Sequence, residues 1–413
     1  MDVNPIEKNI FTVSLPTSKS VLIRLLLIRF LYANEVIAIE ENSCEDVKIV
    51  HSNLQIISKH TNSNEEITIH VKDCGAAYRF FLSLLTVTKG KWFLTGNERL
   101  LTRPIAPLIK SLQSIGANIV QTPNGIHIIG NELVASEIEI EGEITSQWAS
   151  SLLLIAKKIH LKKLTLVPPI NSLTYITLTC DLLNLNGLNI HQKENLFFIK
   201  TAENTQSTFE ITNREKDWSS AIFWYALAAI YNNYLFYFPH LSLQSLQGDK
   251  IIASWFQNFG IYSQEVGNGI LTTYRLTTLN NFYEFDLANH PDLAMVLAVL
   301  AILLPCNLSL KNLKTLNYKE SERLTILSNS LTHFAPTEAT KDHQLIIYGK
   351  QRFTTFEQPI ALDSHEDHRL AIAFSLLSCR YPISVKNKSC VKKSYPTFWN
   401  ELAEFQNFTK NLT

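Results

Sequence analysis

The chain has 413 residues, of which 46% are hydrophobic, and its 37 basic side chains balance 37 acidic ones. This length exceeds what one hydrophobic core usually serves, so we expect two domains of about 200 residues each. The neutral charge balance excludes a global field that would attract nucleic acid or an acidic membrane, so any affinity for anions must come from local clusters of cations.

Signals for targeting, membrane insertion and metal binding are missing from the sequence. Residues 1–16 lack the basic start and apolar core of a signal peptide, and the longest apolar run, 293–305, is too short to span a membrane. The six cysteines form no CxxC pair, and helix-start geometry explains His365 and His368 as well as metal ligation does. We therefore expect a cytoplasmic protein with free thiols and no bound metal.

Along the chain, a short polar or charged motif runs six times into a long apolar, helix-like stretch. The motifs are Ser18-Lys19-Ser20, Gly75-Ala76-Ala77-Tyr78-Arg79, Thr145-Ser146-Gln147, Asp217-Trp218-Ser219-Ser220, His290-Pro291-Asp292 and Asp367-His368-Arg369. Their starts lie 57, 70, 72, 73 and 77 residues apart, an interval that indicates six copies of one supersecondary unit. Chance spacing of ordinary capped helices is the alternative.

Shorter segments with strand character lie between the helical stretches. They include ITIHV, KWFLTG, ANIVQT, GIHIIG, IEIEGEI, LTLVP, QLIIYG and PISVK. Helical stretches such as AIFWYALAAI are apolar on nearly every face, which predicts helices buried within a ring of sheets. With three repeats in each domain, the boundary falls near residues 212–215, and the segment before Pro16 pairs with strands of the second domain.

The polar motifs suit an enzyme that handles anions. Free N–H groups and the positive end of the dipole make helix starts ready sites for phosphate and carboxylate. Binding alone needs only cations, whereas Asp292, Glu320 and Asp367 stand beside the basic motifs, as acid/base chemistry requires. The sequence therefore favours an enzyme over a passive binding protein.

Ten segments in order give the chain a resemblance to the enolpyruvyl transferase family over nearly its whole length. They are LPTSKSVLIR at 15–24, DCGAAYR at 73–79, LTGNERLLTRPI at 94–105, TSQWASSLL at 145–153, the segment of Ser172 and Tyr175, EKDWSSA at 215–221, HPDLAM at 290–295, KESERL at 319–324, DHRLAIAFSLL at 367–377 and KKSYPTFW at 392–399. Any one of these segments is a weak signal, but ten in the family order are a strong one.

The resemblance implies an α/β (α+β) fold, a two-domain inside-out α/β barrel in which each domain has three βαβαββ repeats around buried helices. It places the domains at 17–213 and at 1–16 with 214–413, with the active site in the cleft between them. It implies transfer of the enolpyruvyl group of phosphoenolpyruvate to the 5-hydroxyl of shikimate 3-phosphate, on the route to aromatic amino acids. No metal or organic cofactor is implied, and the expected state is a monomer that closes on its substrates.

The resemblance also assigns roles to residues. Asp292 is expected to deprotonate the 5-hydroxyl and Glu320 to protonate the methylene carbon, with Lys19, held by Asp46, sharing proton transfer. Shikimate 3-phosphate is expected to contact Lys19, Ser20, Arg24, Thr145, Ser146, Gln147, Ser172, Tyr175, Asp292, Thr315 and Lys319. Phosphoenolpyruvate is expected to contact Lys19, Gly75, Arg103, Gln147, Arg323, Arg369 and Lys393. Asp367 and His368 are expected to orient Arg369 and tune Glu320.

Several positions depart from the family pattern, and two rival functions stay open. Thr17, Ile23, Ala76, Thr315 and Trp218 replace the usual residues, which puts substrate affinity in doubt more than reaction type. The first rival is the sister reaction on UDP-N-acetylglucosamine, whose enzymes usually carry a loop cysteine that is absent from residues 97–103. The second is a non-catalytic anion-binding relative.

Overall fold

The computed structural model describes residues 9–201, 215–356 and 358–410, and the chain divides into two compact units. We call Lys19–Asn213 the inserted unit, and Met1–Ser18 together with Arg214–Thr413 the discontinuous unit. The boundary expected near residues 212–215 lies mostly outside the described residues.

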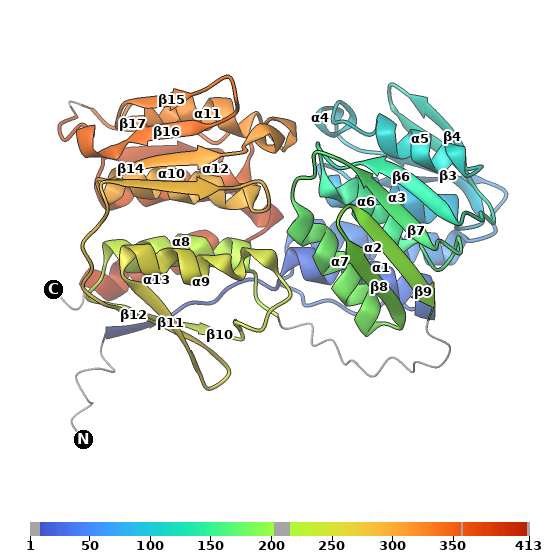
Figure 1. Cartoon of the computed structure of the whole chain (residues 1–413), viewed down its shortest axis with the longest axis horizontal. Helices are drawn as coiled ribbons and strands as arrows, with labels where there is room; N and C mark the ends of the chain where they lie inside the picture. The colour runs from blue at the N-terminus through green and yellow to red at the C-terminus, as the bar shows by residue number, and fades with distance from the viewer. Residues whose placement is uncertain (1–8, 202–214, 357, 411–413) are drawn as a thin grey trace. The chain divides into compact units, whose positions relative to one another are not determined.

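The inserted unit alternates helices with strands (Figure 1). Its helices are α1 (Lys19–Ala33), α2 (Glu45–His60), α3 (Gly75–Thr86), α4 (Glu98–Leu101), α5 (Ala106–Ser114), α6 (Ser146–Leu154) and α7 (Leu173–Leu185). Its strands are β2 (Glu66–His70), β3 (Gly90–Thr95), β4 (Asn118–Thr122), β5 (Gly125–Gly130), β6 (Glu137–Glu141), β7 (Lys163–Val167), β8 (Leu188–Lys193) and β9 (Leu196–Thr201).

The discontinuous unit begins with a strand from the N-terminal segment and continues after the inserted unit. Its helices are α8 (Trp218–Ile230), α9 (Ile252–Trp255), α10 (Ala294–Leu303), α11 (Arg323–Leu331), α12 (His368–Leu376) and α13 (Phe398–Lys410). Its strands are β1 (Ile10–Thr12), β10 (Leu235–Pro239), β11 (Ile261–Val266), β12 (Gly269–Tyr274), β13 (Phe282–Asp286), β14 (Asn307–Lys311), β15 (Thr337–Ala339), β16 (Leu345–Tyr348), β17 (Ile360–Asp363) and β18 (Ile383–Lys386). Short 3₁₀ helices connect them: η2 (Gly248–Ile251), η3 (Phe256–Phe259), η4 (Pro291–Leu293), η5 (Lys314–Tyr318), η6 (Gly349–Gln351), η7 (Leu377–Cys379) and η8 (Lys388–Lys393).

One strand arrangement recurs in four sheets, with the orders β1-β10-β12-β11, β13-β14-β16-β15, β2-β3-β5-β4 and β6-β7-β9-β8. In each, the first two strands are parallel and the last two form an antiparallel hairpin. Strand β1 supplies the parallel partner of β10, with Ile10 opposite Leu235. The N-terminal segment therefore completes a sheet of the discontinuous unit, as the sequence predicted.

Each of the six polar motifs lies at the start of a helix or of the 3₁₀ turn that leads into one. These helices are largely buried: all ten residues of α10 and all residues of α8 except Ile230 are buried. In the discontinuous unit, α8 and α10 lie between the sheet of β10–β12 and the sheet of β14–β16 (Figure 1). The predicted buried helices, with their polar N-terminal ends, are confirmed.

One repeat in each unit departs from the βαβαββ pattern. In the discontinuous unit, β17 and β18 form a two-stranded parallel sheet, and no strand follows them in the described residues. In the inserted unit, the first repeat departs from the pattern. Helix α2 ends at His60 and β2 begins at Glu66, so only residues 61–65 lie between them. A hairpin needs two strands and a turn, roughly ten residues or more, and this gap is too short for one. Among the described residues of this unit, two four-stranded sheets therefore stand where three repeats would predict three.

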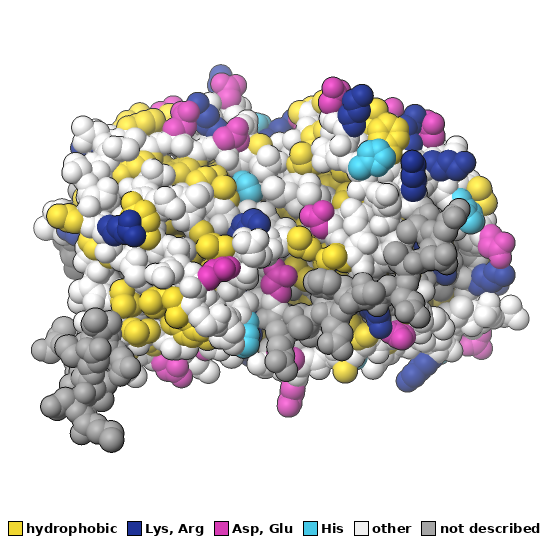
Figure 2. Space-filling view, turned by 60° about the horizontal axis from the view of Figure 1, so that its bottom comes forward, with side chains coloured by type: hydrophobic (Ala, Val, Ile, Leu, Met, Phe, Trp, Pro, Cys, Tyr) yellow, Lys and Arg dark blue, Asp and Glu magenta, His cyan; other side chains and the backbone are white. Residues whose placement is uncertain are grey.

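On the face in Figure 2, basic and acidic side chains are interspersed over both units. Over the described part of the chain, no helix is both long and apolar enough to span a bilayer, and no cluster of three or more metal-binding side chains is found. All six cysteines are free thiols.

Candidate active site

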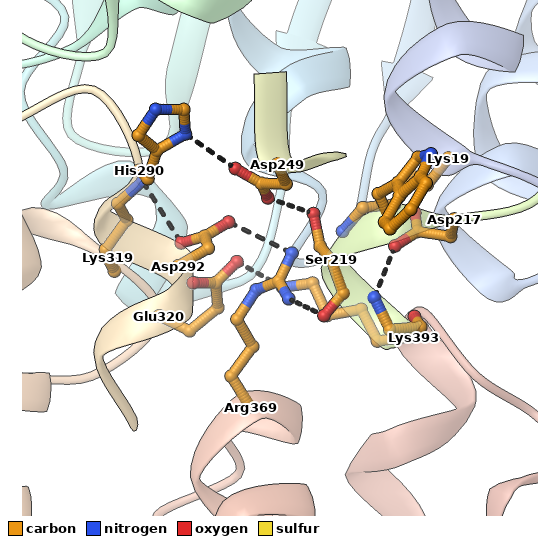
Figure 3. A network of polar contacts seen from close by, with 12 residues as sticks. Lys19, Asp217, Ser219, Asp249, His290, Asp292, Lys319, Glu320, Arg369 and Lys393 are labelled. Carbon is orange, nitrogen blue, oxygen red and sulfur yellow. Dashed lines mark hydrogen bonds and ion pairs between the residues drawn. The ribbon is translucent and has the colours of Figure 1, made fainter. Parts of the chain in front are cut away.

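The residues predicted to do chemistry in the discontinuous unit come from four segment ends. Asp292 lies in η4, at the start of the buried helix α10, and Arg369 lies in the first turn of α12. Lys319 and Glu320 follow η5, and Lys393 ends η8. Figure 3 shows that these side chains converge on one network.

Asp292 is surrounded by cations. Its Oδ1 lies 2.8 Å from Arg323 Nη1 and 3.6 Å from Lys319 Nζ, and its Oδ2 lies 3.0 Å from Arg369 Nη2. Burial alone would raise the pKa of Asp292, but the attraction of Arg369, Lys319 and Arg323 outweighs it and holds the pKa well below its usual range. Without substrate, Asp292 is therefore a counter-ion that binds protons weakly.

Arg323 holds the carboxylates of this cluster in place. It is 1% exposed, and its guanidinium contacts Asp367 and Glu320 at 2.7 Å as well as Asp292. Burial would lower the pKa of Arg323, but the three carboxylates together raise it above its usual value. Arg323 therefore stays positively charged, and three carboxylates of the protein already balance this charge.

Glu320 lies between two cations. Its Oε2 accepts a hydrogen bond from Arg323 Nη2 at 2.7 Å, and its Oε1 lies 3.4 Å from Lys393 Nζ. Asp367 caps α12 by accepting from the backbone N–H of Arg369 at 3.0 Å, and it also accepts from Ser321. This cap supports the expectation that Asp367 orients Arg369.

Lys19 and Asp46 form an ion pair in the inserted unit. Lys19 Nζ lies 3.0 Å from Asp46 Oδ2, and the Asp46 side chain is only 5% exposed. Asp46 belongs to the first turn of α2, and Lys19 is the first residue of α1. The predicted contact between the lysine amine and this carboxylate is present.

Arg24 is a buried cation whose partners are all uncharged. Its Nε donates to Thr179 Oγ1 at 2.7 Å, its Nη1 to the Ser20 carbonyl, and its Nη2 to Tyr175 O and Ser150 Oγ. Burial lowers the pKa of Arg24 to about 10, so it keeps its charge at neutral pH. Four of its five N–H groups therefore donate to protein acceptors.

Gly75, at the start of α3, lies against two guanidinium groups. A Cβ added to this glycine would lie 2.6 Å from Arg103 Nη1 and 2.9 Å from Arg79 Nη1. No real Cβ atom tolerates such contacts, so a side chain here would displace the arginines. The arrangement places the N-terminal end of α3 beside two cations, which suits an anion.

Three other predicted residues lie at the starts of helices α6 and α7. Thr145 caps α6 by accepting from Gln147 N at 3.2 Å, and Ser146 is buried behind it. Ser172 is buried and adopts a left-handed backbone with φ 56°, a conformation that collects at ligand sites when it is not glycine.

Three buried polar atoms of predicted site residues have no hydrogen-bond partner among the described residues. They are Arg103 Nε, Gln147 Oε1 and Thr315 Oγ1. Because buried polar groups are rarely left unsatisfied, a ligand or water is expected to complete these positions. Thr315, which replaces the usual asparagine, offers a hydroxyl in place of the amide at this position.

Five polar residues that support the site had no role assigned to them from the sequence. Ser150 and Thr179 hold Arg24, and they stand within apolar helices where nothing marks them as functional. Ser219, His290 and Asp249 form contacts beside Asp292. Ser219 and His290 belong to two of the six polar motifs at helix starts. Asp249 lies in no such motif, and its sequence neighbourhood indicates only a polar turn.

The chain is similar to known proteins over nearly its whole length. A profile of the family described as EPSP synthase (3-phosphoshikimate 1-carboxyvinyltransferase) matches residues 12–402. A Bacteroides fragilis (strain YCH46) protein named 3-phosphoshikimate 1-carboxyvinyltransferase is 30% identical over 398 residues, covering 95% of this chain and 94% of its own. A protein of the same name from Pseudoalteromonas translucida is 27% identical, covering 97% and 98%.

Solved structures support the fold. The EPSP synthase of Acinetobacter baumannii matches with a TM-score of 0.70 and 18% identity, over 96% of this chain and 95% of that chain. The enolpyruvyl transferase NikO from Streptomyces tendae matches with a TM-score of 0.68 and 14% identity. With a family match that spans nearly all of its residues, the chain belongs to the EPSP synthase (3-phosphoshikimate 1-carboxyvinyltransferase) family.

Proposed function

We propose that this chain transfers the enolpyruvyl group of phosphoenolpyruvate to the 5-hydroxyl of shikimate 3-phosphate and releases phosphate. The observation that carries the proposal is the partly buried network in which Asp292 and Glu320 are held by Arg323, Arg369, Lys319 and Lys393. Family membership supports this activity, and the relatives' names favour it over the UDP-N-acetylglucosamine reaction.

The residues of the inserted unit are proposed to bind substrate anions. Thr145, Ser146 and Ser172 offer hydroxyls to the shikimate phosphate, while Ser20, Arg24, Gln147 and Tyr175 orient the ring and its carboxylate. Gly75 and Arg103 offer donors to the phosphate of phosphoenolpyruvate, since the start of α3 and the neighbouring guanidinium groups form an anion site. Lys19 is proposed to contact both substrates.

The residues of the discontinuous unit are proposed to bind the remaining groups. Arg323 and Arg369 take the carboxylate of phosphoenolpyruvate, and Lys393 takes its phosphate. Thr315 and Lys319 bind shikimate 3-phosphate. Because both ligand sets must act on the same pair of substrates, the proposal requires the two units to close on them.

The reaction is proposed to proceed by addition and elimination. Asp292 accepts the proton of the 5-hydroxyl as that oxygen bonds to C2 of phosphoenolpyruvate, and Glu320 gives a proton to the methylene carbon. In the second step Glu320 removes a proton from the new methyl group, the double bond forms, the bond between C2 and the phosphate oxygen breaks, and Asp292 returns its proton to the leaving phosphate. Lys19 stabilises the developing charge and shares proton transfer.

Substrate anions explain how Asp292 can become a base. The carboxylate of phosphoenolpyruvate competes with Asp292 for Arg369, and the anions of both substrates compete for the other cations. As these cations turn toward substrate, the proton affinity of Asp292 rises toward that of an ordinary carboxylate. The internal ion pairs therefore hold the cations ready for the substrates.

The test is phosphate release from phosphoenolpyruvate with shikimate 3-phosphate or UDP-N-acetylglucosamine as acceptor. We expect release with shikimate 3-phosphate only, and kcat lower by about 10²–10⁴ in Asp292→Asn and Glu320→Gln. Glu322→Gln is the matched control, because this exposed carboxylate lies between Ser321 and Arg323 and outside the network. Release with the nucleotide sugar would establish the sister reaction, and no release from folded protein would establish a non-catalytic relative.

A further inference from the structure

A second layer of polar side chains lies beside the Asp292 network. Its centre is Asp249 in η2, which is 3% exposed. One carboxylate oxygen of Asp249 lies 3.3 Å from His290 Nδ1, and the other accepts a hydrogen bond from Ser219 Oγ at 2.5 Å. Both oxygens of this buried carboxylate are therefore directed at named partners (Figure 3).

The two partners of Asp249 lead to the proposed reacting groups. The carbonyl of Ser219 accepts a hydrogen bond from Arg369 Nη1 at 3.4 Å, and Arg369 Nη2 lies 3.0 Å from Asp292 Oδ2. His290 precedes Asp292 by two residues. These four contacts, together with the backbone between His290 and Asp292, close a ring that runs through Asp249, Ser219, Arg369, Asp292 and His290.

The start of η4 needs such a support. His290 precedes the 3₁₀ turn with φ −134° and ψ 48°, and no side chain caps the turn. Its imidazole is held instead by Asp249 on one side and by Trp255, which packs edge-on with ring centroids 5.5 Å apart. Fixing this ring fixes the backbone from which the Asp292 side chain projects.

We propose that Asp249, acting through Ser219 and His290, is a positioning residue that sets the side-chain geometry of Asp292 and Arg369 for enolpyruvyl transfer. The inference rests on the proposed function, since it assigns Asp292 the role of base and Arg369 the role of carboxylate ligand. None of the three second-layer residues is required to touch substrate. Because misplacing a reacting group by about 1 Å can cost on the order of 10²-fold in rate, a lost second-layer contact has a measurable effect.

The test compares Asp249→Asn and Ser219→Ala with wild type in kcat, in KM for each substrate and in melting temperature. We expect kcat to fall by roughly 10–100-fold and KM for phosphoenolpyruvate to rise, with KM for shikimate 3-phosphate and the folded fraction unchanged. Ser254→Ala is the control, since this exposed hydroxyl donates to the Ile251 carbonyl next to η2 and lies outside the ring.

A double-mutant cycle separates positioning from a general structural role. If Asp249 acts on proton transfer through Asp292, then Asp249→Asn lowers kcat little further in an Asp292→Asn background, while it still raises KM for phosphoenolpyruvate through Arg369. Losses in kcat that multiply in full between the two substitutions would overturn the proposal. If Asp249→Asn does not fold, the same cycle with Ser219→Ala decides.

The activity of the wild-type protein distinguishes a failure of the proposed function from a failure of the proposed positioning role. Wild-type protein that is inactive with shikimate 3-phosphate contradicts the proposed function. Active wild type with unchanged kcat and KM in both Asp249→Asn and Ser219→Ala contradicts only the positioning role.

Discussion

At the scale of single residues, Asp292 has the most unusual environment of the site, because one carboxylate faces three cations. An acid whose pKa is depressed by folding stabilises the protein above its unfolded pKa, and this contribution is lost as the pH falls toward the folded value. The pKa of Asp292 is held well below its usual range of about 4. Its contribution is therefore present at neutral pH and weakens below about pH 4.

Asp292→Asn should lower the free energy of unfolding of the ligand-free protein by about 3 kcal/mol at pH 7, because three cations lose a shared partner. The difference from wild type should shrink as the pH falls below about 4. Denaturant unfolding across pH 2.5–8, on the order of ten conditions, measures it. A difference that stays constant with pH would contradict the assigned ion pairs.

Gly75→Ala should raise KM for phosphoenolpyruvate on the order of tenfold, since losing one hydrogen bond to a charged group costs about 1.5–3 kcal/mol. The added Cβ would meet Arg103 Nη1 at 2.6 Å and push that guanidinium away from the anion site. Stability should change little, because the displaced atoms are the flexible ends of side chains. KM for shikimate 3-phosphate is the internal control, and an equal rise in both constants would argue against a local effect.

At the scale of elements, Arg24 joins three helices of the inserted unit. It belongs to α1, and it donates to Ser150 on α6 and to Thr179 and Tyr175 O on α7. The hydrogen bonds of this cation form at one alignment of the three helices. They therefore specify that alignment, which apolar packing alone does not do. The alignment also sets where Tyr175 and the start of α6 lie.

Thr179→Val should destabilise the inserted unit by about 1.5–3 kcal/mol, because the change keeps the shape of the side chain but leaves the buried Nε–H of Arg24 without an acceptor. Thr86→Val is the matched control. Its hydroxyl is equally buried but donates only to the Ser83 carbonyl, so its loss should cost about 1 kcal/mol. Urea unfolding of the two variants measures the difference, and equal costs would mean that Arg24 finds another partner.

The helices and strands were predictable because their signals are local. The six polar motifs start helices because caps such as Thr145, Asp217 and Asp367 act within a few residues. Each predicted strand segment contains a strand, since alternation and bounding turns are also local signals. The missing hairpin after α2 was not predicted, because the interval between two helix starts does not show which strands lie between them.

The site was predictable only where residues stand in recognisable motifs. Asp292, Glu320 and Arg369 belong to such motifs, and the structure brings them together. Asp249 is joined to Ser219 across 30 positions and to His290 across 41, and periodicity carries no information about such pairings. Ser150 and Thr179 were missed because hydroxyls within apolar helices are ordinary core residues in most proteins.

At the scale of the whole molecule, each unit has its own core, and the inserted unit is continuous in sequence. The core of the discontinuous unit includes Phe11, Val13 and Leu15 from the N-terminal segment. The two units should therefore differ in what they need in order to fold alone.

Residues 19–213 expressed alone should fold and unfold cooperatively in urea. Residues 214–413 expressed without 1–18 should not, because β10 loses its parallel partner and the core loses three apolar side chains. Adding back residues 1–18 as a peptide should restore a cooperative transition in the second fragment. Cooperative unfolding of 214–413 without that peptide would show that β1 is dispensable.

The pairing of β1 with β10 also has a consequence for protein synthesis. Ile10 leaves the ribosome more than two hundred residues before its partner Leu235. At roughly 5–20 residues per second, the segment with Phe11, Val13 and Leu15 stays unpaired for about 10–45 seconds while the inserted unit is made and can fold. During that interval these apolar side chains are exposed to chaperones and to neighbouring nascent chains, so slow translation between residues 19 and 235 should lower the yield of correctly folded protein.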